Sequence, residues 1–422
     1  MVDKVVCKAS GCSNLIQETT AARTGGRCMP CVQAAAKKER DEYIRKNRRD
    51  FNEFEGVTDV VEALKVIHKP RKYDPLINWI PHPTPTDELY LGLSESEQSR
   101  LTEYAKGLVG TERNQEAEEI CLCLSAFTST PLDACLRRLV SYGRILPSLA
   151  FRNAPVDVRD ELVERVECDA CSRGPALLAL AWIGDSTVVE HFRKWRSEKP
   201  AWGDSLFIPP EDYSREAGWE LTPEGNRRDL VFPQCHALES GASNTAEPFR
   251  AISERGDHCP WCSSKLTNLF QVELAAFGLP HTDACRDQVE VLTCEVCTAF
   301  GTVFSSIDRN GSTVWSPRNV RPEYLPDDSD AWGRLPQGSL RVGKGRSALH
   351  SADQFLPTRF SQIGGYPTWV QDSAYPKCLE CSQTMMFLAQ VDRQDIEQYS
   401  EGMFFAFVCL DCLATATVYQ QT

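Results

Sequence analysis

Residues 378–392 read CLECSQTMMFLAQVD, and residues 403–412 read MFFAFVCLDC. Two Cys-x-x-Cys pairs, Cys378 with Cys381 and Cys409 with Cys412, therefore frame two apolar runs. Short apolar runs rich in aromatic and branched residues predict buried β-strands. A two-residue gap lets both thiolates of a tight turn bind one ion, and a second such turn completes a tetrahedron. This stretch predicts a β fold built around a zinc-ribbon-like site.

The same arrangement of cysteines occurs twice more in the chain. One set lies in CPWC and CEVC, and the other has a looser half near the N-terminus, in which four residues separate the two cysteines. Four thiolates leave no open position for a water molecule, so such sites stabilise folding and do not activate water. We therefore expect about three structural zinc ions, held by Cys7, Cys12, Cys28 and Cys31, by Cys259, Cys262, Cys294 and Cys297, and by Cys378, Cys381, Cys409 and Cys412.

The remaining cysteines and one histidine have plainer interpretations. Cys168 and Cys171 form an isolated Cys-x-x-Cys pair, either a redox pair or, as we favour, two cysteines near a helix end. His258 precedes Cys259, and we expect a surface or supporting residue here and not a ligand. Small buried apolar positions are expected for Cys121, Cys123, Cys135, Cys235 and Cys285.

Length and composition indicate a globular protein of more than one domain. The chain has 422 residues, enough for two to four domains, with 42% hydrophobic and 25% charged residues, which is ordinary globular composition. No apolar run approaches the ~20 residues of a membrane span, and the N-terminus lacks a secretory signal pattern. We expect a cytoplasmic protein with no membrane contact. Clustered cysteines in a reducing compartment favour metal binding over disulfides.

Charge is distributed unevenly along the chain. The formal net charge is −13, yet residues 1–72 carry 15 Lys and Arg against 10 Asp and Glu. The rest carries 31 basic and 49 acidic residues. Such an acidic bulk repels nucleic acid and suits a basic protein partner, or it simply aids solubility.

Pattern changes along the chain indicate an α+β multidomain protein. Residues 32–51 read as a charged helix after Pro30, and residues 95–197 show helical spacing that resembles HEAT-type pairs or a plain bundle. From about residue 263 the pattern becomes β, with Asn310-Gly311 as a hairpin turn and residues 321–357 as a long loop. The expected domains are a zinc knuckle with basic helix (1–68), a proline-rich connector (69–94), a helical domain (95–197), a zinc-ribbon β region (198–320) and a β region with the last four-cysteine site (321–422).

The C-terminus also carries a family resemblance. FSQIGGYPTWVQD at residues 360–372 contains Gly364, Gly365, Pro367 and Gln371, and the strand from Phe387 to Asp392 follows it. This combination resembles the YwqG-like family of bacterial proteins, over about residues 340–422. The cysteine pairs around those strands depart from the simplest members. The whole layout is similar to immunity proteins encoded beside polymorphic or type VI secretion toxins.

No catalytic motif is recognisable in the sequence. Walker A, GxSxG and HExxH patterns are absent, and Gly343-Lys344-Gly345-Arg346 reads as a flexible basic loop and not as a phosphate loop. We therefore expect no enzyme but an inhibitor that binds a basic cognate toxin, with exposed carboxylates such as Glu116, Glu118 and Glu119 in the contact. The alternatives are a zinc-ribbon protein that binds nucleic acid through residues 8–49, a scaffold for another partner, and an unrecognised enzyme.

Overall fold

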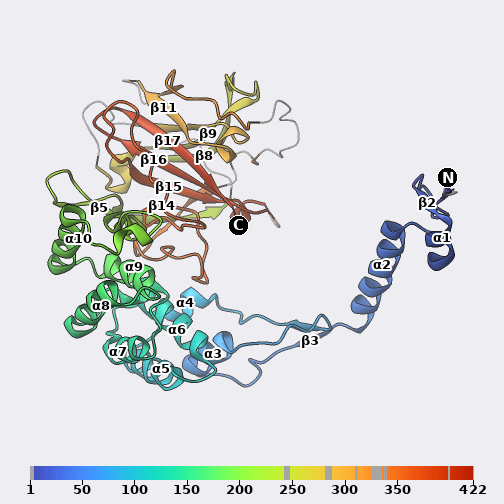
Figure 1. Ribbon diagram of the computed structural model, residues 1–422, viewed down its shortest axis with the longest axis horizontal. Helices are drawn as coiled ribbons and strands as arrows, with labels where there is room; N and C mark the ends of the chain where they lie inside the picture. The colour runs from blue at the N-terminus through green and yellow to red at the C-terminus, as the bar shows by residue number, and fades with distance from the viewer. Residues whose placement is uncertain are drawn as a thin grey trace. The chain divides into compact units, whose positions relative to one another are not determined.

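The computed structural model describes residues 4–241, 248–280, 288–308, 312–325, 335, 336, 338, 340–397 and 400–421. The chain divides into two compact units, Met1–Pro83 and Thr84–Thr422. Helices and strands both contribute, with a large antiparallel sheet in the C-terminal half (Figure 1), so the predicted α+β class is confirmed. No helix in the described ranges has both the length and the apolar character that crossing a bilayer requires.

The first unit contains two small sheets and three helices. Strands β1 and β2 pair antiparallel, and β3 and β4 pair parallel. Helix α2 starts with Pro30 in its first turn, as predicted, and ends at Asn47, so the helix is shorter than expected. The elements are β1 (Lys4–Val6), β2 (Leu15–Gln17), α1 (Glu18–Thr24), α2 (Met29–Asn47), β3 (Arg49–Phe51), α3 (Val60–His68) and β4 (Ile77–Trp79).

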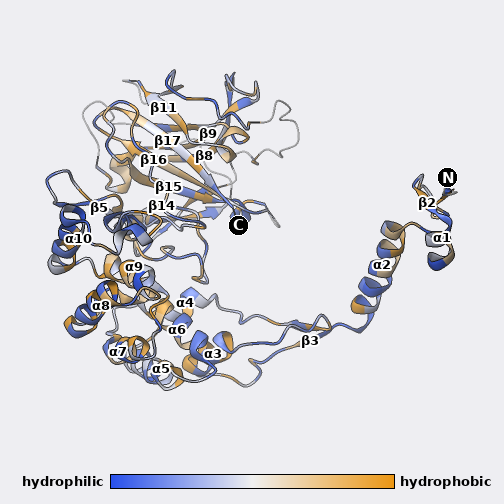
Figure 2. Ribbon diagram, viewed as in Figure 1, coloured by the Kyte–Doolittle hydropathy of each residue, from blue (hydrophilic) through white to orange (hydrophobic). Residues whose placement is uncertain are grey.

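The second unit begins with a succession of short helices. Helices such as α5 (Glu95–Leu108) and α10 (Ser186–Glu198) bury one apolar face, whereas the second half of α6 (Asn114–Phe127), from Ile120 to Phe127, is buried on all sides. Figure 2 shows hydrophobic and hydrophilic residues on the same helices. Gly184 ends α9 (Arg173–Ile183) in the left-handed conformation, and the Asp185 side chain caps the start of α10. The helices are α4 (Thr86–Leu91), α5 (Glu95–Leu108), α6 (Asn114–Phe127), α7 (Asp133–Ser141), α8 (Val156–Cys168), α9 (Arg173–Ile183) and α10 (Ser186–Glu198), with the 3-10 turns η1 (Ser148–Phe151), η2 (Gly203–Ser205) and η3 (Pro210–Ala217).

The β region consists of two sheets and one small hairpin. An eight-stranded antiparallel sheet has the order β12-β11-β17-β16-β15-β14-β7-β13, a three-stranded sheet has the order β10-β9-β8, and β5 pairs with β6. The strands are β5 (Trp219–Leu221), β6 (Arg227–Asp229), β7 (Phe232–Ser240), β8 (Phe249–His258), β9 (Lys265–Val272), β10 (Val289–Thr293), β11 (Val303–Ile307), β12 (Thr313–Trp315), β13 (Leu340–Gly345), β14 (Gln362–Gly365), β15 (Met386–Asp392), β16 (Met403–Cys409) and β17 (Ala414–Gln420), with the 3-10 turns η4 (Leu274–Phe277), η5 (Cys297–Ala299) and η6 (Arg393–Asp395).

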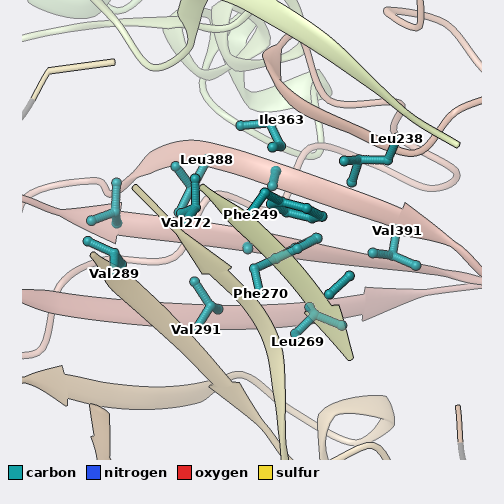
Figure 3. Close-up of a cluster of buried hydrophobic side chains, with 14 of the residues drawn as sticks. Leu238, Phe249, Leu269, Phe270, Val272, Val289, Val291, Ile363, Leu388 and Val391 are labelled. Carbon is teal, nitrogen blue, oxygen red and sulfur yellow. The ribbon is translucent and has the colours of Figure 1, made fainter. Parts of the chain in front are cut away.

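The main core lies between the two sheets. Phe249, Phe270 and Val291 of the smaller sheet pack with Leu238 and Leu388 of the larger one, all nearly inaccessible to solvent. Figure 3 shows these side chains gathered together between the strands. Strand β16 is buried along its whole length, because its alternate residues enter the cores on both faces of the sheet.

The β pattern predicted from about residue 263 onward is confirmed, whereas the prediction of a long loop is not confirmed throughout. The runs at 265–274, 288–294, 301–308, 384–392, 403–411 and 415–421 each contain a strand. The expected long loop at 321–357 is wrong in part, because Leu340–Gly345 pairs with β7 at the edge of the sheet. Gly343 and Gly345 thus belong to a strand, not to a flexible loop. The predicted turn at Asn310-Gly311 lies outside the described residues, although β11 and β12 on either side of it do pair.

Candidate metal centres

The first cysteine set lies in a loop–helix arrangement near the N-terminus. Cys7 and Cys12 flank a tight turn, Cys28 occupies the position directly before α2, and Cys31 lies in the first turn of that helix. The backbone N–H of Cys28 donates to the Cys7 sulfur at 3.2 Å. All four sulfurs lie within 4.8 Å of one another, so this centre could hold one metal ion.

Little else holds this part of the chain together. The buried members of its core are Ile16 and two of the cysteines, Cys7 and Cys28, and α2 buries none of its residues. A core this small cannot offset the conformational entropy of an ordered knuckle. An ion held by the four sulfurs could supply the stabilisation that this small core lacks.

The second and third centres share one turn design. The backbone N–H of Ser263 donates a hydrogen bond to the Cys259 carbonyl, and Ser263 adopts the left-handed backbone conformation with φ of 62°. After Cys378, Ser382 makes the same bond to the Cys378 carbonyl, with φ of 63°. A turn of this kind directs both cysteines of a Cys-x-x-Cys pair to the same side. The same turn conformation thus follows the first cysteine of the Cys-x-x-Cys pair in two separate parts of the β region.

Each of these two centres joins strand ends that are distant in sequence. Cys259 and Cys262 lie in the turn from β8 to β9, and their partners follow β10. In the third centre one pair precedes β15, and the other consists of Cys409 at the end of β16 and Cys412 in the turn to β17. Several of these cysteines are also members of the hydrophobic clusters, namely Cys259, Cys294, Cys297, Cys378 and Cys409. An ion at either centre would fix the ends of three strands.

The spacing of the sulfur atoms matches tetrahedral coordination. Sulfurs about 2.3 Å from one ion, at the corners of a tetrahedron, lie about 3.8 Å apart, well beyond the S–S bond of a disulfide. None of the described cysteines forms a disulfide. The measured separations are 3.7 Å for Cys12 and Cys28, 3.7 Å for Cys259 and Cys297, 3.5 Å for Cys262 and Cys294, and 3.8 Å for Cys381 and Cys409.

Local hydrogen bonds favour the metal-binding form of the sulfur. Donors from the Asn14 side chain and the Cys31 backbone lower the pKa of Cys28 to about 6. The backbone N–H of Gln383 lowers the pKa of Cys381. A thiolate, and not a thiol, is the metal ligand. The donors favour the thiolate at these two sulfurs, whereas hydrogen bonds with the neighbouring sulfurs raise the pKa of Cys31 and of Cys412.

The other cysteines lie apart from these centres. Cys168 ends α8, and Cys171 lies in the turn after it, both exposed, as expected for two cysteines near a helix end. His258 is exposed at the end of β8. The predicted burial is confirmed for Cys121, Cys123, Cys135 and Cys235, and Cys285 lies outside the described residues.

The GG-x-P element adopts a conformation that requires glycine. Gly364 has φ of 66°, and a Cβ there would lie 1.9 Å from the carbonyl oxygen of Gln234 on the paired strand β7. The buried Gln362 donates its side-chain N–H to the Tyr366 carbonyl at 2.6 Å. Gln371 donates to the carbonyl of Gln421 at 2.8 Å. Gly364 thus allows β14 to lie close to β7, and Gln371 links the loop after β14 to Gln421 near the C-terminus.

The carboxylates expected on an exposed contact face are engaged inside the protein. Glu116 is only 1% exposed and pairs with Arg113 at 2.7 Å. Glu118 accepts a hydrogen bond from Arg144 at 3.0 Å, and Glu119 is half-buried. The expectation of an open acidic face at these positions is therefore wrong for Glu116. The spacing of residues along the helix does not show that Glu116 is buried or that it pairs with Arg113.

Comparison with known proteins extends over the whole chain. No protein family model matches it, and no solved structure matches it. A protein of Salmonella typhimurium named "Uncharacterized protein YpfL" is 49% identical over 426 residues, which cover 100% of both chains. The similarity therefore spans both compact units.

Proposed function

Because this chain belongs to the same family as the uncharacterized protein YpfL, we propose a function for it from its own geometry and charge. It acts as a cytoplasmic immunity protein, which binds a cognate secreted antibacterial toxin and neutralises it by protein–protein inhibition. The toxin is basic and is a nuclease of the kind delivered by type VI secretion. The YwqG-like C-terminus and the layout of the chain support this proposal by resemblance.

Zinc is the metal proposed for all three centres. Four sulfurs at tetrahedral spacing suit zinc or an iron–sulfur site. Zinc suits a role in folding, since it has no redox chemistry and a four-thiolate site is closed. The twelve cysteines would hold the ions, and the ions would supply folding energy to the knuckle and the strand ends. The hydrophobic neighbours Leu266 and Phe387 complete the packing around the second and third centres.

The observation that carries the binding proposal is the contrast in charge between the two units. Residues 1–83 contain 15 basic and 11 acidic residues, whereas residues 84–422 contain 31 basic and 48 acidic residues. Nuclease toxins present basic clefts, and opposite charge accelerates association and suppresses wrong partners. Closed metal sites add rigidity to the acidic unit, and a rigid surface loses less entropy on binding.

Co-expression tests this proposal. The protein, co-expressed with the toxin-like gene next to its own, should restore growth and co-purify with that toxin. A variant of the toxin from another strain, with a different interface, provides the specificity control. Absence of both rescue and a co-purifying partner would remove the support for an inhibitor.

A second candidate function concerns the N-terminal unit. Helix α2 is exposed along its length and carries Lys37, Lys38, Arg40, Arg45 and Lys46, which could contact nucleic acid phosphates. Acidic residues are interleaved with them, and Lys46 pairs with Glu42 at 3.3 Å. Nucleic acid binding by the full chain, lost steeply as salt rises and lost on Lys37→Glu with Arg40→Glu, would favour this candidate.

A further inference from the structure

A cavity of about 450 Å³ lies in the second unit, where the helices meet the loops before β15. Its walls come from α9, from residues 207–216 and from residues 352–355 and 369–373. The backbone N–H of Ser373 donates to the Glu216 carboxylate at 2.6 Å, and Trp182 packs on Tyr366 with ring centroids 5.2 Å apart. The first contact joins two walls of the cavity, and the second packs the α9 wall against Tyr366, which follows β14. The volume falls within the ~300–1,000 Å³ typical of binding pockets. The cavity is thus a formed feature of the unit.

Negative charge in this cavity is not balanced by the protein. Arg215 is the one cation among the described lining residues, and it pairs with Asp212 at 3.1 Å. Glu216, Asp353 and Asp372 make no ion pair within the described chain. Burial raises the pKa of Glu216 and of Asp353, because the charged forms lack a compensating cation. A cation that entered the cavity would supply that compensation.

Apolar side chains stand exposed at the same cavity. Phe207 is fully exposed, Phe355 is 73% exposed and Ile208 is 44% exposed. Exposed apolar residues that line a concave, partly polar site mark binding surfaces. Trp369 lies in the wall, and its buried indole N–H has no acceptor among the described residues.

We propose that this cavity receives an arginine side chain of the partner protein, flanked by an apolar residue, an assignment that rests on the proposed inhibitor function. The carboxylates of Glu216 and Asp353 face the guanidinium. Phe207 and Phe355 cover the neighbouring apolar side chain. Arginine suits the site better than lysine, because its planar guanidinium stacks on aromatic rings and donates several hydrogen bonds at once.

Calorimetric titration of the full-length protein tests the assignment. The probes are acetyl-Leu-Arg-Leu-amide and its citrulline counterpart, which has a similar shape but no charge. The arginine peptide should bind at least tenfold more tightly than the citrulline peptide. Glu216→Gln combined with Asp353→Asn should abolish that preference, whereas Glu112→Gln with Glu401→Gln, two exposed carboxylates outside the cavity, should preserve it. Metal content and circular dichroism verify that each variant is folded.

Equal binding of both peptides, no binding of either, or an unchanged preference in the cavity variant would overturn the assignment. A lysine peptide that binds more tightly than the arginine peptide would overturn the choice of arginine. These outcomes are separable from the inhibitor proposal. Toxin rescue that persists in the cavity variant, with no peptide preference, refutes the cavity alone. A clear arginine preference without any toxin rescue supports the cavity and refutes the inhibitor.

Discussion

The hydroxyl oxygens of Thr293 and Thr417 lie 2.9 Å apart, across the two sheets of the β region. Thr293 directly precedes Cys294 of the second metal centre and also lies 2.6 Å from the Thr298 hydroxyl. Thr417 belongs to β17, which follows Cys412 of the third centre. Both hydroxyls are buried, and the three hydroxyls of Thr298, Thr293 and Thr417 satisfy one another in a chain of short contacts. The second and third centres are therefore linked through the sheet interface.

Loss of the second centre should weaken the region around the third. Cys262→Ser and Cys381→Ser should each lower the free energy of urea unfolding. The double variant should lose less free energy than the two single losses added together, by about 0.5–3 kcal/mol. Cys31→Ser empties a centre in the other unit, so the unfolding midpoint of Thr84–Thr422 should not change. Tryptophan fluorescence follows this transition. Additive effects of Cys262→Ser and Cys381→Ser would contradict the linkage.

The exposed cysteine pair at the end of α8 should be dispensable. Cys168→Ser with Cys171→Ser should leave metal content, unfolding midpoint and toxin protection as in the wild type, since both thiols lie apart from the three centres. Elemental analysis and the co-expression assay provide the readouts. Protection lost at normal metal content and normal fold would assign the pair a redox role.

Gly364 should tolerate no side chain. Gly364→Ala places a Cβ into the carbonyl of Gln234 at a positive φ, so the strand pairing of β14 and β7 must move. We expect a loss of more than about 3 kcal/mol in unfolding free energy. Gly143→Ala is the matched control, because Gly143 has φ of 69° but open space around its Cβ position. That variant should lose about 1 kcal/mol. Equal losses would show that the contact with Gln234 is unimportant.

A buried carboxyl at the end of β15 should make stability depend on pH. Burial, reinforced by the nearby Asp395 charge, raises the pKa of Asp392 to about 6 from 3.8. The folded state then holds this proton more tightly than the unfolded state, so stability falls as pH rises from about 4 to 6. Asp392→Asn removes this loss. The free energy of unfolding of the variant minus that of the wild type should rise by about 1 kcal/mol between pH 5 and pH 7.5, as measured by urea unfolding. A constant difference across that range would contradict the raised pKa.

The sequence predicted most reliably the features that local spacing decides. Cys-x-x-Cys pairs bring their own thiols together, and apolar runs such as MFFAFVC form strands wherever both faces can be covered. Strand β7 was missed, because Pro233 and polar residues interrupt its apolar pattern. Strand β13 was missed because it lies at the sheet edge and contains Gly343 and Gly345, which read as a loop.

Features formed by distant segments could not be predicted in this way. Trp182, Glu216 and Asp353 line one cavity although up to 171 positions separate them in the chain. Glu216 and Asp353 show no unusual sequence context, and their burial follows from how the helices and loops pack. The inward position of Glu116 depends likewise on Arg113 and on the helices around it. Such sites are set by tertiary packing and carry no local signal.

The central claim, a zinc-held protein that binds one toxin, is tested most directly by native mass spectrometry. The full-length protein is purified without chelators from cells that also express the adjacent toxin gene. The predicted result is a complex of the 47.3 kDa chain with three zinc ions and one toxin molecule. A free chain with one zinc ion or none, from protein that is otherwise folded, would contradict the claim.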